Sequence, residues 1–276
     1  MPIKDLFIYP IKSCGGIWLE KFMLTESGPE HDREFTIIDE KTGVIISQRT
    51  HPTLALVKPQ FDPKSGGLIL EAAGMQPLVL PLEEDQSSDL SSIQIHKDTC
   101  SARLMRSEYS EWFCDFLHTH CAIVRRDPNS PRIRHADALG RKITVSFADG
   151  YPLLVTSVQS LAELNLRIAM NKGLRIPMDR FRPNVVIDRV YGPYGEDEIK
   201  PSTKIKAGMA LIEAGKLCDR CPITTVNQAT GTRSFNEPLA TLSKFRKVGS
   251  GVVFGRTFGV AEPGMVWVGA SFDHEI

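Results

Sequence analysis

The sequence predicts a mixed α/β fold in which strands outnumber helices. Three observations indicate it: many short apolar runs rich in Ile, Val, Leu and Phe, Gly, Pro or Asp at their ends, and only three stretches with helical spacing of apolar residues. With 276 residues, the chain has room for one large or two small domains. It shows no internal repeats and no low-complexity tract.

The first hundred residues or so are predicted to form strands joined by tight turns, one of them around Thr42-Gly43. That many strands without intervening helices indicate a small antiparallel barrel or sandwich. The predicted strands are Lys4–Tyr9, Gly16–Thr25, Phe35–Asp39, Val44–Ser47, Ala55–Phe61, Gly67–Ala72, Pro77–Pro81 and Ile93–His96.

A helix is predicted next, over Glu108–His118, because four aromatic residues recur there at helical spacing. Such a stripe is typical of core packing rather than of a binding site. The following segment, Arg125–Lys142, is polar, rich in Arg and broken by two prolines. We expect it to be a loop or linker, with a second domain beginning near Ile143.

The second half alternates predicted strands with two helices. The helix Val158–Ile168 has Ser157 as a natural N-cap, and a shorter helix is expected at Pro238–Lys247. The predicted strands are Thr144–Ala148, Pro152–Val155, Asn184–Asp188, Ile205–Ala214, Gly251–Ala261 and Met265–Ala270.

Charge and composition exclude several classes of partner. Lys plus Arg equals Asp plus Glu, 33 each, so no global field attracts nucleic acid or a membrane surface. The first residues lack the apolar core of a signal peptide, and no later stretch approaches the length of a membrane span. We therefore expect a cytoplasmic protein without a membrane segment or nucleic-acid partner, with six mostly reduced cysteines.

Several common catalytic motifs are absent from the sequence. There is no Walker A loop, no G-x-G-x-x-G, no H-E-x-x-H and no G-x-S-x-G. Nucleotide-binding P-loop enzymes, Rossmann dehydrogenases and α/β-hydrolases are therefore poorly supported.

The most informative segment is LCDRCPITTVNQATG, which contains Cys218 and Cys221. A structural zinc site needs four ligands, and no second C-x-x-C exists. A redox dithiol is expected at a strand-to-helix turn, whereas Pro222 and the β-branched run after it favour an extended segment. A single thiolate ligand for a soft metal is the third possibility, with Arg220 favouring the deprotonated form. These residues alone do not separate the last two interpretations, and inert core cysteines also remain possible.

Isolated basic residues stand at strand ends or in tight turns, where an anion site would need them. Lys12-Ser13 ends an apolar run and precedes Gly15-Gly16, whose turn is expected to expose backbone N–H groups. Arg33, Arg49 and Arg182 each lie next to a predicted strand. Arg offers a planar fork suited to phosphate or to polar ring edges. For any one of these residues taken alone, a surface salt bridge is the commoner role.

Five segments then resemble one family. IYPIKSCGG, HDREF with SQR after it, FADGYPLLVTS, DRFRPNVVI and CDRCPITTVNQATG occur in this order across nearly the whole chain. They resemble the MOSC family, in particular the amidoxime-reducing components and the YcbX-type bacterial proteins. The resemblance implies a MOSC N-terminal β-barrel-like domain over 1–122 and a MOSC β-barrel domain with a few helices over 123–276.

This resemblance also implies the molybdenum cofactor, a pterin whose dithiolene holds the metal and whose tail carries a phosphate. The second cysteine of the C-x-x-C pattern, Cys221, is then the metal ligand and the catalytic residue, and Cys218 receives no role. Thr257 stands where animal relatives have Tyr, so no contact is assigned to it. The residues expected to contact the cofactor are Lys12, Ser13, Arg33, Arg49, Asp149, Gly150, Arg182, Asn184, Asp219 and Arg220.

The activity implied by the resemblance is reduction of small N-hydroxylated compounds such as amidoximes, hydroxylamines and N-hydroxylated base analogues. The chain has no ferredoxin-like cysteine pattern. Electrons are therefore expected from a separate donor protein, either ferredoxin-like or cytochrome b5-like with its reductase. Pyridoxal phosphate binding is an expectation of the family as a whole only. The alternative function is a carrier or binding module for molybdenum cofactor or sulfur.

Overall fold

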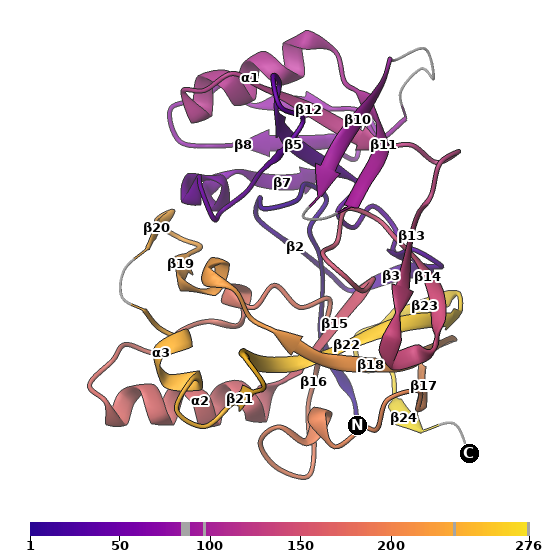
Figure 1. The fold of residues 1–276 in the computed structure, drawn as a ribbon, viewed down its shortest axis with the longest axis vertical. Helices are drawn as coiled ribbons and strands as arrows, with labels where there is room; N and C mark the ends of the chain where they lie inside the picture. Colours follow the sequence, from indigo (N-terminus) through magenta and orange to yellow (C-terminus); the bar gives the residue numbers. More distant parts are fainter. Residues whose placement is uncertain (84–88, 96–97, 234–235, 275–276) are drawn as a thin grey trace.

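The computed structural model describes residues 1–276 except 84–88, 96–97, 234–235 and 275–276, and it confirms a strand-rich mixed α/β fold (Figure 1). The largest sheet has the strand order β2-β1-β16-β15-β22-β18-β17-β24, with β21 paired to β22. Its strands are β1 (Ile3–Ile8), β2 (Ile17–Leu19), β15 (Leu153–Ser157), β16 (Val185–Ile187), β17 (Lys204–Ala207), β18 (Ala210–Asp219), β21 (Lys247–Val248), β22 (Gly251–Glu262) and β24 (Phe272–His274).

A second unit is built from a five-stranded sheet, β10-β11-β12-β5-β6, and a three-stranded sheet, β7-β8-β9. Figure 1 shows α1 (Ser107–Leu117) and β12 side by side in this unit. The aromatic stripe of α1 packs into its core, as the helical spacing predicts. The strands are β5 (Phe35–Asp39), β6 (Ile45–Ile46), β7 (Lys58–Phe61), β8 (Leu68–Glu71), β9 (Leu78–Leu80), β10 (Leu90–Ile95), β11 (Asp98–Leu104) and β12 (Cys121–Arg126).

The two ends of the chain share one core. β1 pairs with β16, and β3 (Lys21–Thr25) lies between β4 (Gly28–Pro29) and β23 (Gly264–Trp267). Apolar side chains from β1, β16, β18 and β22 form the largest buried cluster. The segment that follows β1, which contains the Lys12-Ser13 turn, is therefore anchored beside strands more than a hundred residues away in the chain.

Helix α2 (Val158–Met170) begins where the sequence predicts. The Oγ of Ser157 accepts a hydrogen bond from the backbone N of Ser160 at 3.1 Å, which is the predicted N-cap. Leu164 and Ile168 pack against Phe181 and other buried residues. The second predicted helix of this half is shorter than expected, α3 (Leu239–Leu242). Within the described residues, no helix is both long and apolar enough to cross a membrane.

Several predicted elements are wrong in type or number. The expected loop Arg125–Lys142 contains β13 (Arg132–Ala136), the turn η2 (Asp137–Leu139) and the start of β14 (Arg141–Val145), which pairs with β13 in a hairpin. Its strand pattern is hidden because a long Arg side chain, Arg132, occupies an inward position. The strands β11 and β12 were also missed.

Two more predictions fail at turns. The single strand Ile205–Ala214 is two strands, β17 and β18, because the chain reverses at Gly208, whose φ of 62° favours glycine. The strand expected from Ala55 begins only at Lys58, after the short helix η1 (Pro52–Leu56). In the predicted strand Ile93–His96, His96 lies outside the described residues. The remaining short helices are η3 (Met178–Arg180) and η4 (Gly195–Asp197).

Candidate functional site

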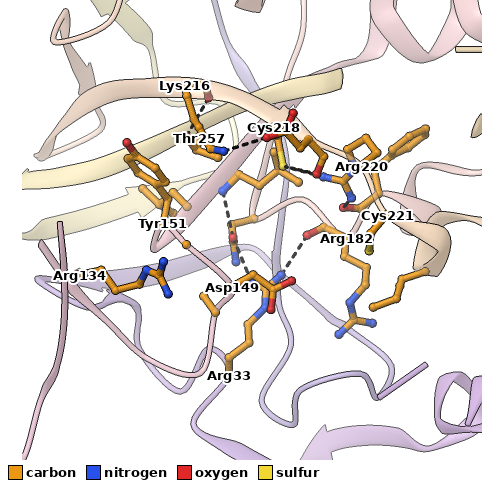
Figure 2. A pocket seen from close by; sticks show the side chains of 18 of the residues that line it. Arg33, Arg134, Asp149, Tyr151, Arg182, Lys216, Cys218, Arg220, Cys221 and Thr257 are labelled. Carbon is orange, nitrogen blue, oxygen red and sulfur yellow. Dashed lines mark hydrogen bonds and ion pairs between the residues drawn. The ribbon is translucent and has the colours of Figure 1, made fainter. Parts of the chain in front are cut away.

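The structure brings the predicted site residues together around one cavity of about 470 Å³. The cavity lies where the loops after β1, β14 and β18 meet the segment that precedes β16 (Figure 2). Its size is within the range usual for small-molecule sites. Ten of the residues expected to contact a cofactor or metal line it: Lys12, Ser13, Arg33, Asp149, Gly150, Arg182, Asn184, Asp219, Arg220 and Cys221.

The eleventh predicted residue, Arg49, reaches the same place from the loop after β6. Its Nη2 lies 3.4 Å from the Sγ of Cys221 and 3.4 Å from the Oδ2 of Asp149. Burial alone would lower the pKa of Arg49, but Cys221 and Asp149 together raise it above its usual value. The contact places a positive charge from another part of the chain beside the sulfur of Cys221.

The backbone after Cys221 differs from the prediction. The expected extended run is a 3-10 turn, η5 (Pro222–Thr225). Pro222 suits its first position, where no N–H is needed. The carbonyl of Cys221 accepts hydrogen bonds from the backbone N and the Oγ1 of Thr224, at 3.1 and 3.0 Å. A redox dithiol was disfavoured because the segment after Cys221 was expected to be extended. That segment is a turn, so this reason no longer applies.

The other cysteine of the motif has a guanidinium of its own. The Nη1 of Arg220 lies 3.0 Å from the Sγ of Cys218, and its Nη2 donates to the carbonyl of Phe181 at 2.7 Å. Arg220 was expected to favour a thiolate in this motif, and the sulfur that its guanidinium contacts is that of Cys218. The backbone N of Arg220 bonds to the carbonyl of Val252 in β22, and its side chain points toward Cys218 (Figure 2).

Lys12 is buried in the wall of the cavity. Its Nζ donates to the carbonyl of Phe147 at 2.7 Å and forms an ion pair with Asp149. Burial lowers the pKa of Lys12, and Asp149 opposes that shift. Three of the amides in the turn around it are bonded within the protein: the N–H groups of Lys12, Cys14 and Gly15 each donate to a backbone carbonyl.

Two guanidinium groups that line the cavity pack over one buried ring. Those of Arg33 and Arg182 lie 4.4 and 4.1 Å from the ring centroid of Tyr9. The Nη1 of Arg33 donates to Asp32 at 2.5 Å, which balances one of the two charges. Burial lowers the pKa of Arg182 to about 10, so this guanidinium remains charged at neutral pH. Tyr9 was not predicted, although it stands in the IYPIK motif.

Three residues of the cavity have strained backbone conformations. Ser13, Arg33 and Arg182 have φ values of 72°, 47° and 55°, in the left-handed region that non-glycine residues rarely adopt. All three line the cavity. Such strain persists only where the surrounding structure enforces it, and it is concentrated at functional sites.

Some residues predicted to contact the cofactor instead form hydrogen bonds with other residues of the chain. The Oδ1 of Asn184 accepts from Arg33 at 3.1 Å and from the backbone N of Leu154 at 3.3 Å, while its Nδ2 donates to Phe7. The carboxylate of Asp219 lies 2.8 Å from the Nζ of Lys216, and this hydrogen bond raises the pKa of Lys216. Both residues therefore support the cavity wall. Gly150, by contrast, faces open space.

Residues that sequence reasoning missed hold the cavity loops in place. The Nη1 of Arg132 donates to the carbonyls of Ser146 and Ala148, at 3.1 and 2.6 Å, and so fixes the loop that carries Asp149. The only signal for Arg132 was its place in the Arg-rich segment taken for a loop.

A second support fixes the loop that carries Arg49. The side-chain amides of Gln48 and Gln228 exchange hydrogen bonds at 3.1 and 3.0 Å. The Nη2 of Arg233, in β20 (Thr232–Arg233), donates to the carbonyl of Gln48 at 2.9 Å. β20 pairs with β19 (Val226–Asn227), directly after η5. Gln48 and Gln228 stand inside the SQR and VNQATG segments, which was the available signal.

The described part of the chain gathers no group of three or more His, Cys, Asp and Glu side chains that could together hold a metal ion. The four ligands of a closed zinc site are therefore not assembled in that part. A site in which the protein supplies one thiolate and the remaining ligands come from a cofactor needs only Cys221.

Comparison with known proteins agrees with this geometry. Residues 1–120 match the family model of the MOSC N-terminal beta barrel domain, and 142–273 match that of the MOSC domain. The chain is 31% identical over 283 residues to mitochondrial amidoxime-reducing component 1 of Mus musculus, covering 97% of this chain and 80% of that protein. Its human counterpart is 30% identical over 286 residues, with 97% and 81% covered. A molybdenum cofactor sulfurase of Oryza sativa subsp. japonica is 28% identical over 266 residues, 92% of this chain and 32% of that protein. This chain therefore belongs to the MOSC family, as a member with the N-terminal MOSC β-barrel domain.

Proposed function

We propose that this protein binds the molybdenum cofactor through Cys221 and reduces small N-hydroxylated compounds. The observation that carries the proposal is the contact between Cys221 and Arg49, 172 positions apart in the chain, at the edge of a cavity lined by basic side chains. Relatives named amidoxime-reducing components, which match 97% of this chain, support the choice of reaction.

The donors around the cavity fit such a cofactor. Within the described residues, the Nη2 of Arg182 and the Nε of Arg220 are buried without a hydrogen-bond partner. A buried donor left unpaired costs about 1–3 kcal/mol, so an anionic or acceptor-rich ligand would relieve both. A phosphate and the polar edge of a pterin are ligands of this kind.

We assign the roles as follows. Cys221 would ligate the metal, with Arg49 holding the thiolate in place. Lys12, Arg33 and Arg182 would supply the positive charge and the donors for the phosphate and the ring. Asn184 and Asp219, although predicted as contacts, would act by holding the loops.

The bound cofactor would supply the two-electron chemistry, in which an N–OH group becomes N–H and water is released. Because the described cavity contains no second redox group of the chain apart from its thiols, we propose that a separate donor protein delivers the electrons. A ferredoxin-like protein or a cytochrome b5 with its reductase would serve.

A second candidate is a carrier that binds and delivers the cofactor or its sulfur. The match to molybdenum cofactor sulfurases, of which this chain spans about a third, favours it. A second thiol, Cys218, also lies in the cavity, 3.0 Å from Arg220.

Turnover separates the two candidates. The protein is produced in a host that makes the cofactor and is assayed with benzamidoxime and a reduced viologen dye as chemical donor. Benzamidine formation that depends on bound molybdenum, and is lost in Cys221→Ser, is the expected result. Loaded protein that is inert with benzamidoxime and hydroxylamines, yet restores activity to a molybdenum-free apoenzyme, would contradict the reductase and support the carrier.

A further inference from the structure

A second pair of thiols lies outside the cavity, in the unit built around α1 and β12. Cys114 is in α1, and Cys121 is the first residue of β12. Their sulfur atoms are 3.7 Å apart. The Sγ of Cys114 also lies 3.3 Å from the backbone N and 3.2 Å from the carbonyl O of Cys121, so it sits directly over that residue.

The surroundings already hold the two thiols in this arrangement. His118 turns the chain at the end of α1 with a φ of 51°, and the backbone N of Thr119 bonds to the carbonyl of Cys114 at 3.3 Å. The Oγ of Ser110 accepts from the backbone N of Ile123 at 3.2 Å, which fixes α1 against β12. The sulfur atoms must therefore move closer by less than about 2 Å to reach the S–S bond length of about 2.05 Å.

The two thiols differ in accessibility. Cys114 is partly exposed, whereas Cys121 is only 2% exposed. Burial, together with the neighbouring Cys114, raises the pKa of Cys121 well above its usual value. Cys114 is therefore the thiol that reacts first with a reagent from solvent, and Cys121 is the thiol that then reacts with Cys114.

We propose that Cys114 and Cys121 form a modification site for low-molecular-weight disulfides such as oxidised glutathione. The sulfur of Cys114 attacks one glutathione sulfur, the glutathione S–S bond breaks, and the first glutathione leaves as a thiol with the proton of Cys114. The sulfur of Cys121 then attacks that of Cys114, and the second glutathione leaves with the proton of Cys121. The protein dithiol loses two electrons, and one glutathione disulfide is reduced to two thiols.

The proximity of the second thiol makes the last step intramolecular and fast, so the mixed disulfide does not accumulate. The product would link the end of α1 to the start of β12 across a short loop. Such a cross-link restricts the unfolded chain, and we expect a rise of roughly 5 °C in the unfolding midpoint.

The test uses the full chain incubated with oxidised glutathione, blocked with iodoacetamide and digested with trypsin. Both cysteines fall on one tryptic peptide, 107–125. The expected result is a peptide that has lost two hydrogens and carries no iodoacetamide label. Cys121→Ser should keep glutathione on Cys114, Cys114→Ser should leave Cys121 without glutathione, and Cys100→Ser, the matched control, should form the same product as the wild type.

A peptide 107–125 that remains fully labelled would overturn the proposal, as would glutathione retained on Cys114 in the wild type. If Cys121→Ser does not fold, Cys121→Ala replaces it, since alanine leaves no unpaired polar group. The site stands apart from the cavity, so this outcome is independent of the proposed function.

Discussion

Cys218 and Cys221 stand three positions apart in one motif, and each has a guanidinium beside its sulfur. The guanidinium at Cys218 comes from Arg220, two positions along the chain and 3.0 Å away. The one at Cys221 comes from Arg49, in a different unit of the fold and 3.4 Å away. The local pair, Arg220 and Cys218, can form within one short segment of the chain. The distant pair, Arg49 and Cys221, can form only when the two units of the fold are assembled.

This difference indicates which of the two thiols lies where distant segments of the chain meet. Arg49 also contacts Asp149, whose carboxylate pairs with Lys12, so three loops meet at Cys221. The Sγ of Cys218, near the end of β18, contacts the carbonyl of Asp219 and the guanidinium of Arg220, both in its own segment of the chain. We therefore expect changes at the distant pair to affect function more than the same changes at the local pair.

The largest expected effect comes from exchanging each thiol for a hydroxyl. Cys221→Ser should lower molybdenum-dependent turnover by more than about 100-fold, because the soft ligand is lost. Cys218→Ser should lower it by less than about threefold, since no role in holding the metal is assigned to that thiol. The measurement is kcat/KM with benzamidoxime. Equal losses in the two variants would remove the distinction between the cysteines.

The guanidinium groups give the next largest contrast. Arg49→Gln should lower kcat/KM about tenfold, the effect of losing one charge-assisted hydrogen bond of 1.5 kcal/mol or so to the ligand thiolate. Arg220→Gln should cost about threefold or less. Steady-state kinetics of both loaded variants decide the matter, and a larger loss in Arg220→Gln would reverse the comparison.

The support of Arg49 can be tested without any cofactor. Gln228→Leu leaves the buried Oε1 of Gln48 without its donor, while the Nε2 keeps its bond to the carbonyl of Ser13, and should lower the free energy of unfolding by about 1–3 kcal/mol. The double variant Gln48→Leu/Gln228→Leu removes both polar groups and should lose less than the sum of the single variants. Urea denaturation of all four proteins gives the coupling energy. Strict additivity would show that the two amides do not act as a pair.

The smallest expected effect concerns Asp98, which holds Arg132 and through it the loop of Asp149. Burial opposes ionisation, but Arg132 and Arg134 hold the pKa of Asp98 below its ordinary value of 3.8. A carboxylate with a lowered pKa stabilises the folded protein above its ordinary pKa, and the contribution is lost as pH falls through the folded value. Asp98→Asn should therefore be less stable than wild type at pH 7, with the difference shrinking as the pH falls below the ordinary carboxyl pKa. Thermal unfolding across pH 3–7 measures it. A difference that grows toward acid pH would contradict the assignment.

Much of the site could be predicted from the sequence because its residues stand at ends of recognisable strands within motifs. All eleven predicted residues lie in or at the cavity. The sequence could not show which of them have side chains free to contact a ligand and which use their side chains to hold the surrounding backbone, as Asn184 does. That depends on pairing of strands distant in the chain.

The errors have local physical causes. The hairpin of β13 and β14 was missed because Arg132 fills an inward position that an apolar residue usually takes. The turn η5 was taken as extended because β-branched residues favour strands, whereas the hydrogen bonds from Thr224 to Cys221 outweigh that preference. Tyr9 was overlooked because its role arises only when the fold brings both Arg33 and Arg182 over its ring.

The most direct test of the central claim is elemental analysis of the wild type, Cys221→Ala and Cys218→Ala, all produced in a host that makes the cofactor. The account predicts molybdenum near one atom per chain in the wild type, retained in Cys218→Ala and lost or labile in Cys221→Ala. Wild-type protein without molybdenum, or zinc that depends equally on both cysteines, would contradict the account.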